Sequence, residues 1–478
     1  MRDTDVIVIG GGVVGCATAD ALARRGASVV LLEKGDDVAV GASRANSGIV
    51  HAGYDCEPNT LKARFNRRGN EMMWTLAREL GVPHKKCGSL VAAPEGGEEG
   101  LRVLLGKAEK NGVRAEIVSR ERALEIEPNL SDDVRFCLYA PEAGVISPYK
   151  LTIKLAERAV LNGAAVVTEA AVEKISQTDG KYVLSTPKGD FKCRFVVNCA
   201  GAGAEKVNVL AGAECFETVF RRGDYFVLDS TEGDNVSTVI FPLPTAAGKG
   251  ILVAPTADGN VIYGPTSVPV NGADTAVASD ALDEIRRAVP LTYRRPAFNK
   301  CIRVYAGVRA IVGDDFMVRE SDVRPGFFTV AGICSPGLTA APAIAEYVAG
   351  LIGGKMPLAE RSDAVVELPH APRLTELSDD EINALVAHNP AWGRIVCRCE
   401  KVTEAEIVAA VHSPVPAVTV DAVKRRVRAG MGRCQGGFCA PRVMEIIARE
   451  TGVPLSAVRK GGEGSEIAVV KVGEADYD

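Results

Sequence analysis

Three glycines near the N-terminus, Gly10, Gly12 and Gly15, have the GxGxxG spacing of loops that bind dinucleotides. The first permits a tight turn, the second lets the backbone approach a pyrophosphate, and the third allows a helix to pack on the preceding strand. Glu33 ends the next apolar run, where its carboxylate can accept hydrogen bonds from both hydroxyls of a ribose. These residues predict a nucleotide-cofactor site, for NAD or FAD. The alternative is a glycine-rich turn without a ligand.

Four of the 13 cysteines gather near the C-terminus and form a second candidate site. One residue separates the members of the first pair and four residues separate those of the second; they are Cys397, Cys399, Cys434 and Cys439. Four thiolates suit a metal centre, and the flexible glycines around the second pair suit the sulfurs of an iron–sulfur cluster. Zinc is the structural alternative, although zinc sites favour CxxC pairs. The other nine cysteines are scattered singly, and we expect free thiols.

The elements that position the glycine motif are two apolar runs, at residues 6–9 and 28–32, with a helical segment at residues 17–25 between them. Two later runs, at residues 195–199 and 327–331, repeat the pattern of a buried strand that leads into a glycine turn and a helix. In a doubly wound sheet such strands return to the first one. We therefore expect a Rossmann-like α/β domain whose cofactor site combines three distant parts of the chain.

Residues 219–311 show a different pattern, in which apolar and polar positions alternate between Gly and Pro turns. The pattern predicts an inserted, mainly antiparallel β domain, which we interpret as the substrate domain. Residues 356–395 are rich in proline and charge and predict a linker, and a small helical module follows.

Composition excludes several classes of protein. The net charge of -5 over 478 residues argues against a nucleic-acid-binding protein. No apolar run is long enough for a transmembrane segment, and the first strand starts too early for a signal peptide. We expect a cytoplasmic protein that reaches the inner face of the membrane only through a partner.

Residues 46–53, together with the glycine motif, resemble the FAD-dependent oxidoreductases of the D-amino-acid oxidase and glycerol-3-phosphate dehydrogenase superfamily. Further matches at residues 220–225, 248–250, 305–309 and 331–339 extend the resemblance over residues 1–355. The sequence is most similar to the large flavin subunits of anaerobic glycerol-3-phosphate dehydrogenases, and next to L-2-hydroxyglutarate oxidases. The resemblance implies FAD.

The region of the four cysteines resembles the bacterioferritin-associated-ferredoxin-like 2Fe-2S domain, which implies a 2Fe-2S cluster with all four cysteines as ligands. The expected organisation is therefore an oxidoreductase domain over residues 1–355, a linker over 356–395, a 2Fe-2S domain over 396–455 and a tail over 456–478. Within the first domain, the FAD-binding parts are expected at about residues 1–80, 146–204 and 306–355, and the substrate domain at about residues 81–145 and 205–305.

The resemblance implies a set of FAD contacts. Glu33 would bind the adenosine ribose, Ser43 and Arg44 would lie along the pyrophosphate, and Ser47 and Gly48 would lie near the isoalloxazine. The backbone around residue 172 would contact adenine, residue 201 would close the pyrophosphate side, and N–H groups of residues 332–339 would stabilise charge on the reduced flavin. The full expected set is Gly10, Gly12, Val14, Gly15, Glu33, Lys34, Ser43, Arg44, Ser47, Gly48, Val172, Gly201, Gly332, Gly337, Leu338 and Thr339.

Three residues are candidates for catalysis. His51 has a suitable pKa to take the hydroxyl proton of an alcohol while a hydride leaves; the alternatives are a merely packed histidine and a covalent attachment point for FAD. Arg309 suits a phosphate or carboxylate on the substrate, and its alternative is a structural ion pair with Asp314 or Asp315. Lys249, in a glycine-flanked loop, has a weaker claim to the same anion.

The resemblance implies a dehydrogenase for a small anionic secondary alcohol, with sn-glycerol 3-phosphate as the first expectation. A 2-hydroxy acid such as L-2-hydroxyglutarate, or an amino acid, is the second. A 2Fe-2S cluster passes electrons singly, so it predicts transfer to a second flavoprotein, an iron–sulfur subunit or the quinone pool. The rival hypothesis is an electron-transfer flavoprotein subunit that oxidises no small molecule.

Overall fold

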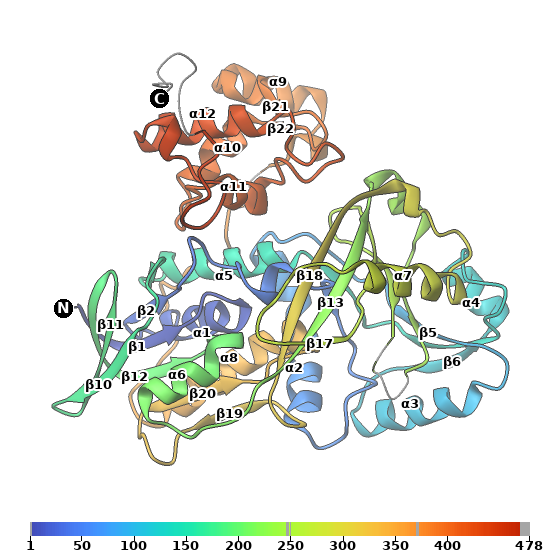
Figure 1. Ribbon diagram of the computed structural model, residues 1–478, viewed down its shortest axis with the longest axis horizontal. Helices are drawn as coiled ribbons and strands as arrows, with labels where there is room; N and C mark the ends of the chain where they lie inside the picture. The colour runs from blue at the N-terminus through green and yellow to red at the C-terminus, as the bar shows by residue number, and fades with distance from the viewer. Residues whose placement is uncertain (1, 245–247, 249, 370–371, 469–478) are drawn as a thin grey trace, which may run out of the picture.

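The computed structural model describes residues 2–244, 248, 250–369 and 372–468. Figure 1 shows a broad body and, above it, a smaller lobe formed by the C-terminal part of the chain. The body contains two large β-sheets with helices around them, and the lobe is mainly helical.

The first sheet has eight strands and a parallel centre. In it, β1 (Arg2–Ile9) pairs in parallel with β2 (Val29–Leu32) on one side and with β12 (Gly189–Asn198) on the other. The sheet continues in parallel from β2 to β9 (Ala165–Val167) and from β12 to β20 (Phe327–Ala331). Its antiparallel members are β10 (Lys174–Thr178), β11 (Lys181–Thr186) and β19 (Met317–Glu320). The prediction that the strands near residues 195 and 327 return to the first sheet is confirmed.

The centre of this sheet is buried on both faces, as is typical of parallel sheets with helices on each side. Along β1, Val6 and Val8 belong to one hydrophobic cluster, whereas Ile7 and Ile9 belong to another. The first cluster includes apolar side chains of α1 (Val13–Ala23), α2 (Leu61–Glu79), α5 (Pro148–Leu161) and α8 (Gly337–Gly353), and the second includes those of α6 (Ala204–Ala211). The Rossmann-like α/β fold is therefore confirmed.

The second sheet has nine strands and is antiparallel except for one pair, β5 with β14. In spatial order the strands are β17 (Val268–Val270), β13 (Val219–Leu228), β16 (Val261–Gly264), β15 (Leu252–Pro255), β14 (Val239–Pro242), β5 (Ser89–Ala93), β7 (Phe136–Ala140) and β6 (Glu116–Ser119), with β18 (Cys301–Ile311) beside β13. Its helices are α3 (Glu98–Lys110), α4 (Arg120–Ile126) and α7 (Ser279–Ala288). A small sheet of β3 (Ile49–Val50), β4 (His84–Lys85) and β8 (Gly144–Ile146) lies apart from both. The predicted mainly antiparallel β domain is confirmed.

The C-terminal lobe has a hydrophobic cluster of its own. Its elements are α9 (Asp379–His388), β21 (Ile395–Cys397), β22 (Val402–Thr403), α10 (Glu404–Val411), α11 (Val420–Val427) and α12 (Ala440–Thr451). The starts of α9 and α10 carry capping boxes, in which Ser378 and Thr403 exchange hydrogen bonds with the glutamates three residues later. No helix in the described part of the chain is both long enough and apolar enough to span a membrane.

Candidate functional site

The glycine turn is packed so tightly that only glycine fits at two of its positions. Gly10 has a φ of +108°, and a Cβ there would lie 2.5 Å from the carbonyl oxygen of Cys199, which directly follows β12. A Cβ on Gly15 would lie 1.9 Å from the carbonyl oxygen of Gly10. The turn between β1 and α1 is therefore held close to the backbone, which fits the approach of a pyrophosphate.

Glu33 lies directly after β2 and is 6% exposed. Its Oε2 accepts a hydrogen bond from the Gly11 N–H at 2.6 Å, and its Oε1 accepts one from the Gly35 N–H at 2.7 Å. Burial raises the pKa of this carboxyl group, and the two backbone hydrogen bonds oppose the rise. The side chain is thus oriented beside the glycine turn, and a carboxylate has lone pairs left for ribose hydroxyls.

A second segment is bound to the start of α1. The side chain of Ser43, in the short helix η1 (Ala42–Arg44), accepts a hydrogen bond from the Val13 N–H at 2.9 Å. Arg44 is exposed, and it lines a cavity shared with the C-terminal lobe. Gly201 starts the 3-10 helix η2 (Gly201–Gly203) after β12, with a φ of +56° and open space at its Cβ position.

The remaining predicted cofactor residues lie on the same parts of the fold. Val14 is buried in α1, Lys34 is exposed after Glu33, and Val172 packs at the edge of the cluster that contains Ile7. Gly332 follows β20 with a φ of +68°, and Gly337 and Leu338 form the first turn of α8. The structure therefore brings the turns after β1, β12 and β20 to one end of the first sheet.

His51 is 9% exposed and is fixed by contacts from two helices. Its N–H donates to Oγ1 of Thr339, in α8, at 2.9 Å, and its carbonyl oxygen accepts from the amides of Asn66 and Asn70, in α2, at 3.3 and 3.0 Å. The ring nitrogen Nε2 lies 3.4 Å from Oγ of Ser335. The imidazole thus lies beside the turn that precedes α8, where the flavin end of the cofactor is expected.

Two stacked tyrosines hold the segment before His51. The register of β13 with β18 places Tyr225 opposite Tyr305, and their rings stack at 4.6 Å with an interplanar angle of 9°. The Tyr305 hydroxyl donates to the Asn46 carbonyl at 2.9 Å. Burial raises the pKa of Tyr225 to about 12, and the charge of Arg309, followed by a hydrogen bond with Ser47, opposes the rise. Sequence reasoning missed this pair, although each tyrosine lies in a segment that carried the family resemblance.

Arg309 is half-buried on β18, and its Nη2 donates to the Thr266 carbonyl oxygen at 2.5 Å. In the described part of the chain it makes no salt bridge, so the alternative of an ion pair with Asp314 or Asp315 is wrong. The Asp315 carboxylate instead accepts from the Leu61 N–H at 2.7 Å and from the N–H of the next residue, at the start of α2. Buried Asp224, which sequence reasoning missed, accepts from the Thr266 hydroxyl at 2.8 Å.

Lys249, the third candidate for catalysis, lies outside the described part of the chain.

The four C-terminal cysteines are arranged as two pairs. Sγ of Cys399 lies 3.8 Å from Sγ of Cys434, and Cys397, at the end of β21, is hydrogen-bonded to Cys439, which precedes α12. That hydrogen bond is the main reason why the pKa of Cys397 is lowered to about 6. Among the described residues, no three His, Cys, Asp or Glu side chains lie close enough together to hold one metal ion. Two separate thiol pairs suit two iron atoms better than one zinc ion, which needs four sulfurs at about 2.3 Å.

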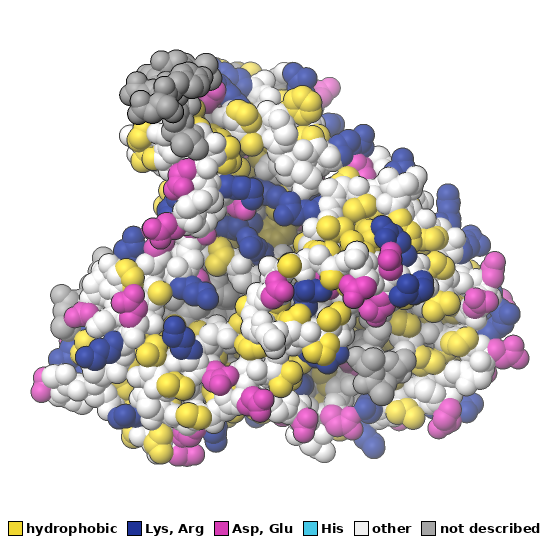
Figure 2. Space-filling model, in the orientation of Figure 1, with side chains coloured by type: hydrophobic (Ala, Val, Ile, Leu, Met, Phe, Trp, Pro, Cys, Tyr) yellow, Lys and Arg dark blue, Asp and Glu magenta, His cyan; other side chains and the backbone are white. Residues whose placement is uncertain are grey.

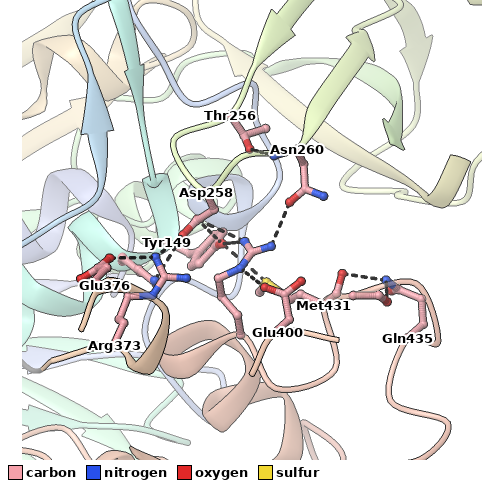
Figure 3. Close-up of polar contacts among 12 residues, drawn as sticks. Tyr149, Thr256, Asp258, Asn260, Arg373, Glu376, Glu400, Met431 and Gln435 are labelled. Atoms are coloured by element: carbon pink, nitrogen blue, oxygen red, sulfur yellow. Dashed lines mark hydrogen bonds and ion pairs between the residues drawn. The ribbon is translucent and has the colours of Figure 1, made fainter. Parts of the chain in front are cut away.

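The lobe is bound to the body through a buried arginine, Arg428. Its Nε lies 2.7 Å from Oε2 of Glu400, its Nη1 lies 3.2 Å from Oδ2 of Asp258, and its Nη2 donates to Asn260 at 2.9 Å. Figure 3 shows these partners and Tyr149 gathered around one point between the lobe and the body. Because Arg428 and Glu400 belong to the lobe and the other partners to the body, this contact fixes the position of the cysteines over the second sheet.

Two more contacts lie next to the cysteines. Arg433 pairs with Asp229 at 2.8 Å, and Arg303, on β18, donates to Oε1 of Gln435 at 2.9 Å. Arg433 and Gln435 flank Cys434, so the cysteine loop itself touches the second sheet.

Comparison with known proteins places the chain in a family. The model of the FAD dependent oxidoreductase family matches residues 5–351, and the model of the BFD-like [2Fe-2S] binding domain matches residues 395–449. The chain therefore belongs to the FAD dependent oxidoreductase family and carries a C-terminal 2Fe-2S domain. The predictions of FAD and of a 2Fe-2S cluster as cofactors are confirmed.

The similarity extends to particular relatives. The chain is 44% identical over 468 residues to the glycerol 3-phosphate dehydrogenase of Caloramator mitchellensis, which covers 97% of this chain and 98% of that protein. It is 33% identical over 374 residues to the glycerol 3-phosphate oxidase of Mycoplasma pneumoniae, which covers 74% of this chain and 96% of that one. The structure of dithionite-reduced L-alpha-glycerophosphate oxidase from Mycoplasma pneumoniae with FAD bound matches with a TM-score of 0.74 at 31% identity, over 78% of this chain and 100% of that one.

Proposed function

We propose that this enzyme oxidises sn-glycerol 3-phosphate to dihydroxyacetone phosphate and delivers the electrons through its 2Fe-2S domain to an acceptor other than oxygen. The observation that carries this proposal is the 44% identity to a glycerol 3-phosphate dehydrogenase over nearly the full length of both chains. The oxidase of Mycoplasma pneumoniae covers only 74% of this chain, which supports a dehydrogenase with a separate route for its electrons.

His51 is proposed to remove the hydroxyl proton of the substrate. A secondary alcohol loses a hydride from carbon and a proton from oxygen, and bound FAD supplies the acceptor of the hydride. Burial limits the contact of the imidazole with water, and the Ser335 hydroxyl 3.4 Å from Nε2 orients the ring. The hydrogen bond that the His51 N–H donates to Thr339, and those that its carbonyl oxygen accepts from Asn66 and Asn70, hold the backbone of His51 in place during this transfer.

Arg309 is proposed to bind the phosphate of the substrate. One guanidinium nitrogen is engaged by the Thr266 carbonyl, which fixes the orientation of the side chain and leaves other N–H groups for an anion. Because no acidic side chain in the described residues pairs with this arginine, its charge is available to a dianionic ligand. A carboxylate would also fit, so a 2-hydroxy acid is the competing substrate class.

The C-terminal cysteines are proposed to hold the cluster as two pairs, and the contacts of Arg428 and Arg433 keep that cluster over the second sheet. The acceptor that takes the electrons from it is proposed to be a second flavoprotein, an iron–sulfur subunit or the quinone pool. A flavin that only relayed electrons would need neither a buried histidine beside the flavin end nor an unpaired arginine.

The test is anaerobic mixing of the enzyme, loaded with FAD and cluster, with sn-glycerol 3-phosphate, L-2-hydroxyglutarate and a panel of amino acids. Bleaching of the flavin by the first compound alone is expected, and His51→Ala should slow this reduction about a hundredfold. His84→Ala is the matched control, because His84 is half-buried on β4, and it should leave the rate unchanged.

Rapid bleaching by L-2-hydroxyglutarate instead would replace the substrate in this proposal. Reduction only by NADH with a partner protein would favour the electron-relay hypothesis.

A further inference from the structure

Arg221, on β13, lies directly opposite Arg309, on β18, in the register of the two strands. Residues paired in this way have Cβ atoms about 5 Å apart and side chains on the same face of the sheet. Both side chains of this arginine pair are half-buried. Like charges that lie directly opposite one another are destabilising, and a bound anion would remove the repulsion.

The two guanidinium groups are anchored to consecutive residues of the segment before β17. Nη2 of Arg309 donates to the Thr266 carbonyl oxygen at 2.5 Å. Arg221 donates from Nη2 to the Ser267 carbonyl oxygen at 2.6 Å and from Nε to Ser267 Oγ at 2.8 Å. Among the described residues, Nη1 of neither arginine makes a hydrogen bond, so each guanidinium group is held in place and keeps N–H groups for a ligand.

No acidic side chain in the described part of the chain forms a salt bridge with either member of the arginine pair. The nearest acid along β13 is Asp224, whose side chain lies on the other face of the sheet because successive residues of a strand alternate. There it pairs with Arg222 at 3.2 Å, and Arg222 also lies 3.8 Å from Asp274. The positive charge of the arginine pair is therefore not neutralised by the protein.

The arginine pair lies on the face of the sheet that meets the segment expected near the flavin. Tyr305, Gly307 and Arg309 share this face, since alternate residues of a strand do so. A Cβ on Gly307 would lie 1.8 Å from the carbonyl oxygen of Ala45, so the backbone before Ser47 packs directly on this face. The arginine pair thus lies on the side of the sheet where the substrate is expected to meet the flavin.

Other cations of the molecule belong to the cofactor site. Figure 2 shows Lys and Arg side chains gathered in the hollow between the lobe and the body. The cavity between these two parts has a volume of about 460 Å³, and Arg44, Arg303 and Lys424 line it. Ser47 and Gly48 line it too, and together with Arg44 they are expected to contact FAD, so the positive charge of this cavity serves the cofactor. Neither member of the arginine pair lines the cavity.

We propose that Arg221 is a second ligand of the substrate phosphate, and that the arginine pair makes the enzyme selective for a phosphate ester over a carboxylate. A carboxylate has two oxygens, which one guanidinium group binds in a bidentate manner. A phosphate monoester has three terminal oxygens and a charge of about −2 at neutral pH, so it engages both guanidinium groups. The inference rests on the proposed function and deepens it, because it names the residues that decide between sn-glycerol 3-phosphate and a 2-hydroxy acid.

The test measures anaerobic bleaching of the flavin by sn-glycerol 3-phosphate in a stopped-flow instrument, with the enzyme loaded with FAD and cluster. Arg221→Gln removes the charge and keeps an N–H donor for the Ser267 carbonyl. It is expected to raise the half-saturating substrate concentration about tenfold or more and to leave the limiting rate within about twofold, because it removes a charge-assisted hydrogen bond to the phosphate. The inhibition constant of inorganic phosphate should rise by a similar factor, whereas inhibition by L-2-hydroxyglutarate should not weaken.

Two further variants separate a role in binding from a role in stability. Arg221→Lys keeps the charge and should recover part of the affinity. Arg120→Gln is the matched control, because this half-buried arginine of α4 pairs with Asp132 and donates to the carbonyl oxygens of Ser131 and Val134 at the far edge of the same sheet. It should leave the half-saturating concentration unchanged. Unchanged half-saturation in Arg221→Gln, or equal losses in Arg221→Gln and Arg221→Lys, would overturn the proposal.

Arg309→Gln, measured in parallel, distinguishes failure of this inference from failure of the proposed function. If Arg309→Gln weakens substrate binding and Arg221→Gln does not, only the second phosphate ligand is wrong. If neither variant weakens binding, the phosphate site proposed at Arg309 is wrong as well. Absence of bleaching in the unmodified enzyme would overturn the proposed function and this inference together.

Discussion

Replacing Arg428 with methionine should loosen the 2Fe-2S lobe from the flavin body. The side chain is 4% exposed and forms ion pairs with Glu400 at 2.7 Å and with Asp258 at 3.2 Å. Methionine fills a similar volume and leaves both carboxylates without this partner. Arg428 has a φ of +69°, so the arginine and the methionine bear a similar backbone cost and the comparison reports the side-chain contacts.

The expected magnitude follows from the contacts that remain. Removal of one partner from a buried ion pair costs about 3–5 kcal/mol. Asp258 keeps Lys150 at 3.3 Å and Arg373 at 3.7 Å, which places the loss at the lower end of this range. A loss of about 3 kcal/mol changes the ratio of docked to undocked lobe by roughly a hundredfold.

Amide hydrogen exchange measures this change directly. In Arg428→Met, protection should fall by about two orders of magnitude in α11 and in the turn after β15, and it should stay constant in β1 and β2, which are remote from the contact. Arg442→Met is the matched control, because the side chain of Arg442 is 50% exposed and pairs with Glu445 on the surface of α12, and its second partner, Glu404, keeps Arg449 at 2.8 Å. Exposed pairs of this kind contribute less than about 1 kcal/mol. Equal exchange in the two variants would refute the argument that Arg428 holds the lobe.

A fall in pH should also loosen the 2Fe-2S lobe from the flavin body, because it protonates Asp258. Burial raises the pKa of this carboxyl group, but the charges of Lys150, Arg428 and Arg373 together outweigh burial and hold the pKa well below its usual range. A carboxyl group with a lowered pKa in the folded state adds stability above its unfolded pKa of about 3.9, and that stability is lost as the pH falls below this value. Exchange protection of α11 should therefore fall below about pH 4, and it should fall by less in Arg428→Met, because one of the three cations that lower the pKa of Asp258 is gone.

Three further predictions concern the cofactors and the core. Gly15→Ala should abolish FAD binding, measured as flavin absorbance after purification, because the new Cβ would lie 1.9 Å from the Gly10 carbonyl oxygen. Arg158→Met should destabilise the body by about 3 kcal/mol in denaturant unfolding, because the buried carboxylate of Asp20 loses the guanidinium at 2.7 Å and keeps the more distant Arg24 at 3.4 Å. Cys397→Ser should remove the iron–sulfur absorbance and keep the FAD content; an intact cluster spectrum would exclude this cysteine as a ligand.

Much of the fold could be predicted from the sequence because its signals are local. The spacing of the first glycines and the acid at residue 33 lie within one strand–helix–strand unit, whose conformation depends on near neighbours. The strands near residues 195 and 327 could be assigned because parallel sheets bury both faces and produce continuous apolar runs. The residue type and the spacing of the four cysteines were enough to predict a metal centre.

Other parts of the site depend on contacts that no local pattern encodes. The stack of Tyr225 on Tyr305 depends on the register of β13 with β18, and a one-residue slip would turn each side chain to the other face. The same register leaves Arg309 without the acidic partner that its neighbours in the sequence suggested.

By itself, the amino-acid sequence predicted the class of fold, a nucleotide-cofactor site and a metal centre from spacing over a few tens of residues, and the family resemblance that it carries implied FAD, the 2Fe-2S cluster and the residues expected to hold them. Only the tertiary structure decided that the cysteines form two pairs, that Arg428 meets Asp258, and that Arg44, Arg303 and Lys424 share a cavity. The physical reason is that the energies of such contacts depend on burial and distance between residues far apart in the chain, and packing of the lobe on the body sets both.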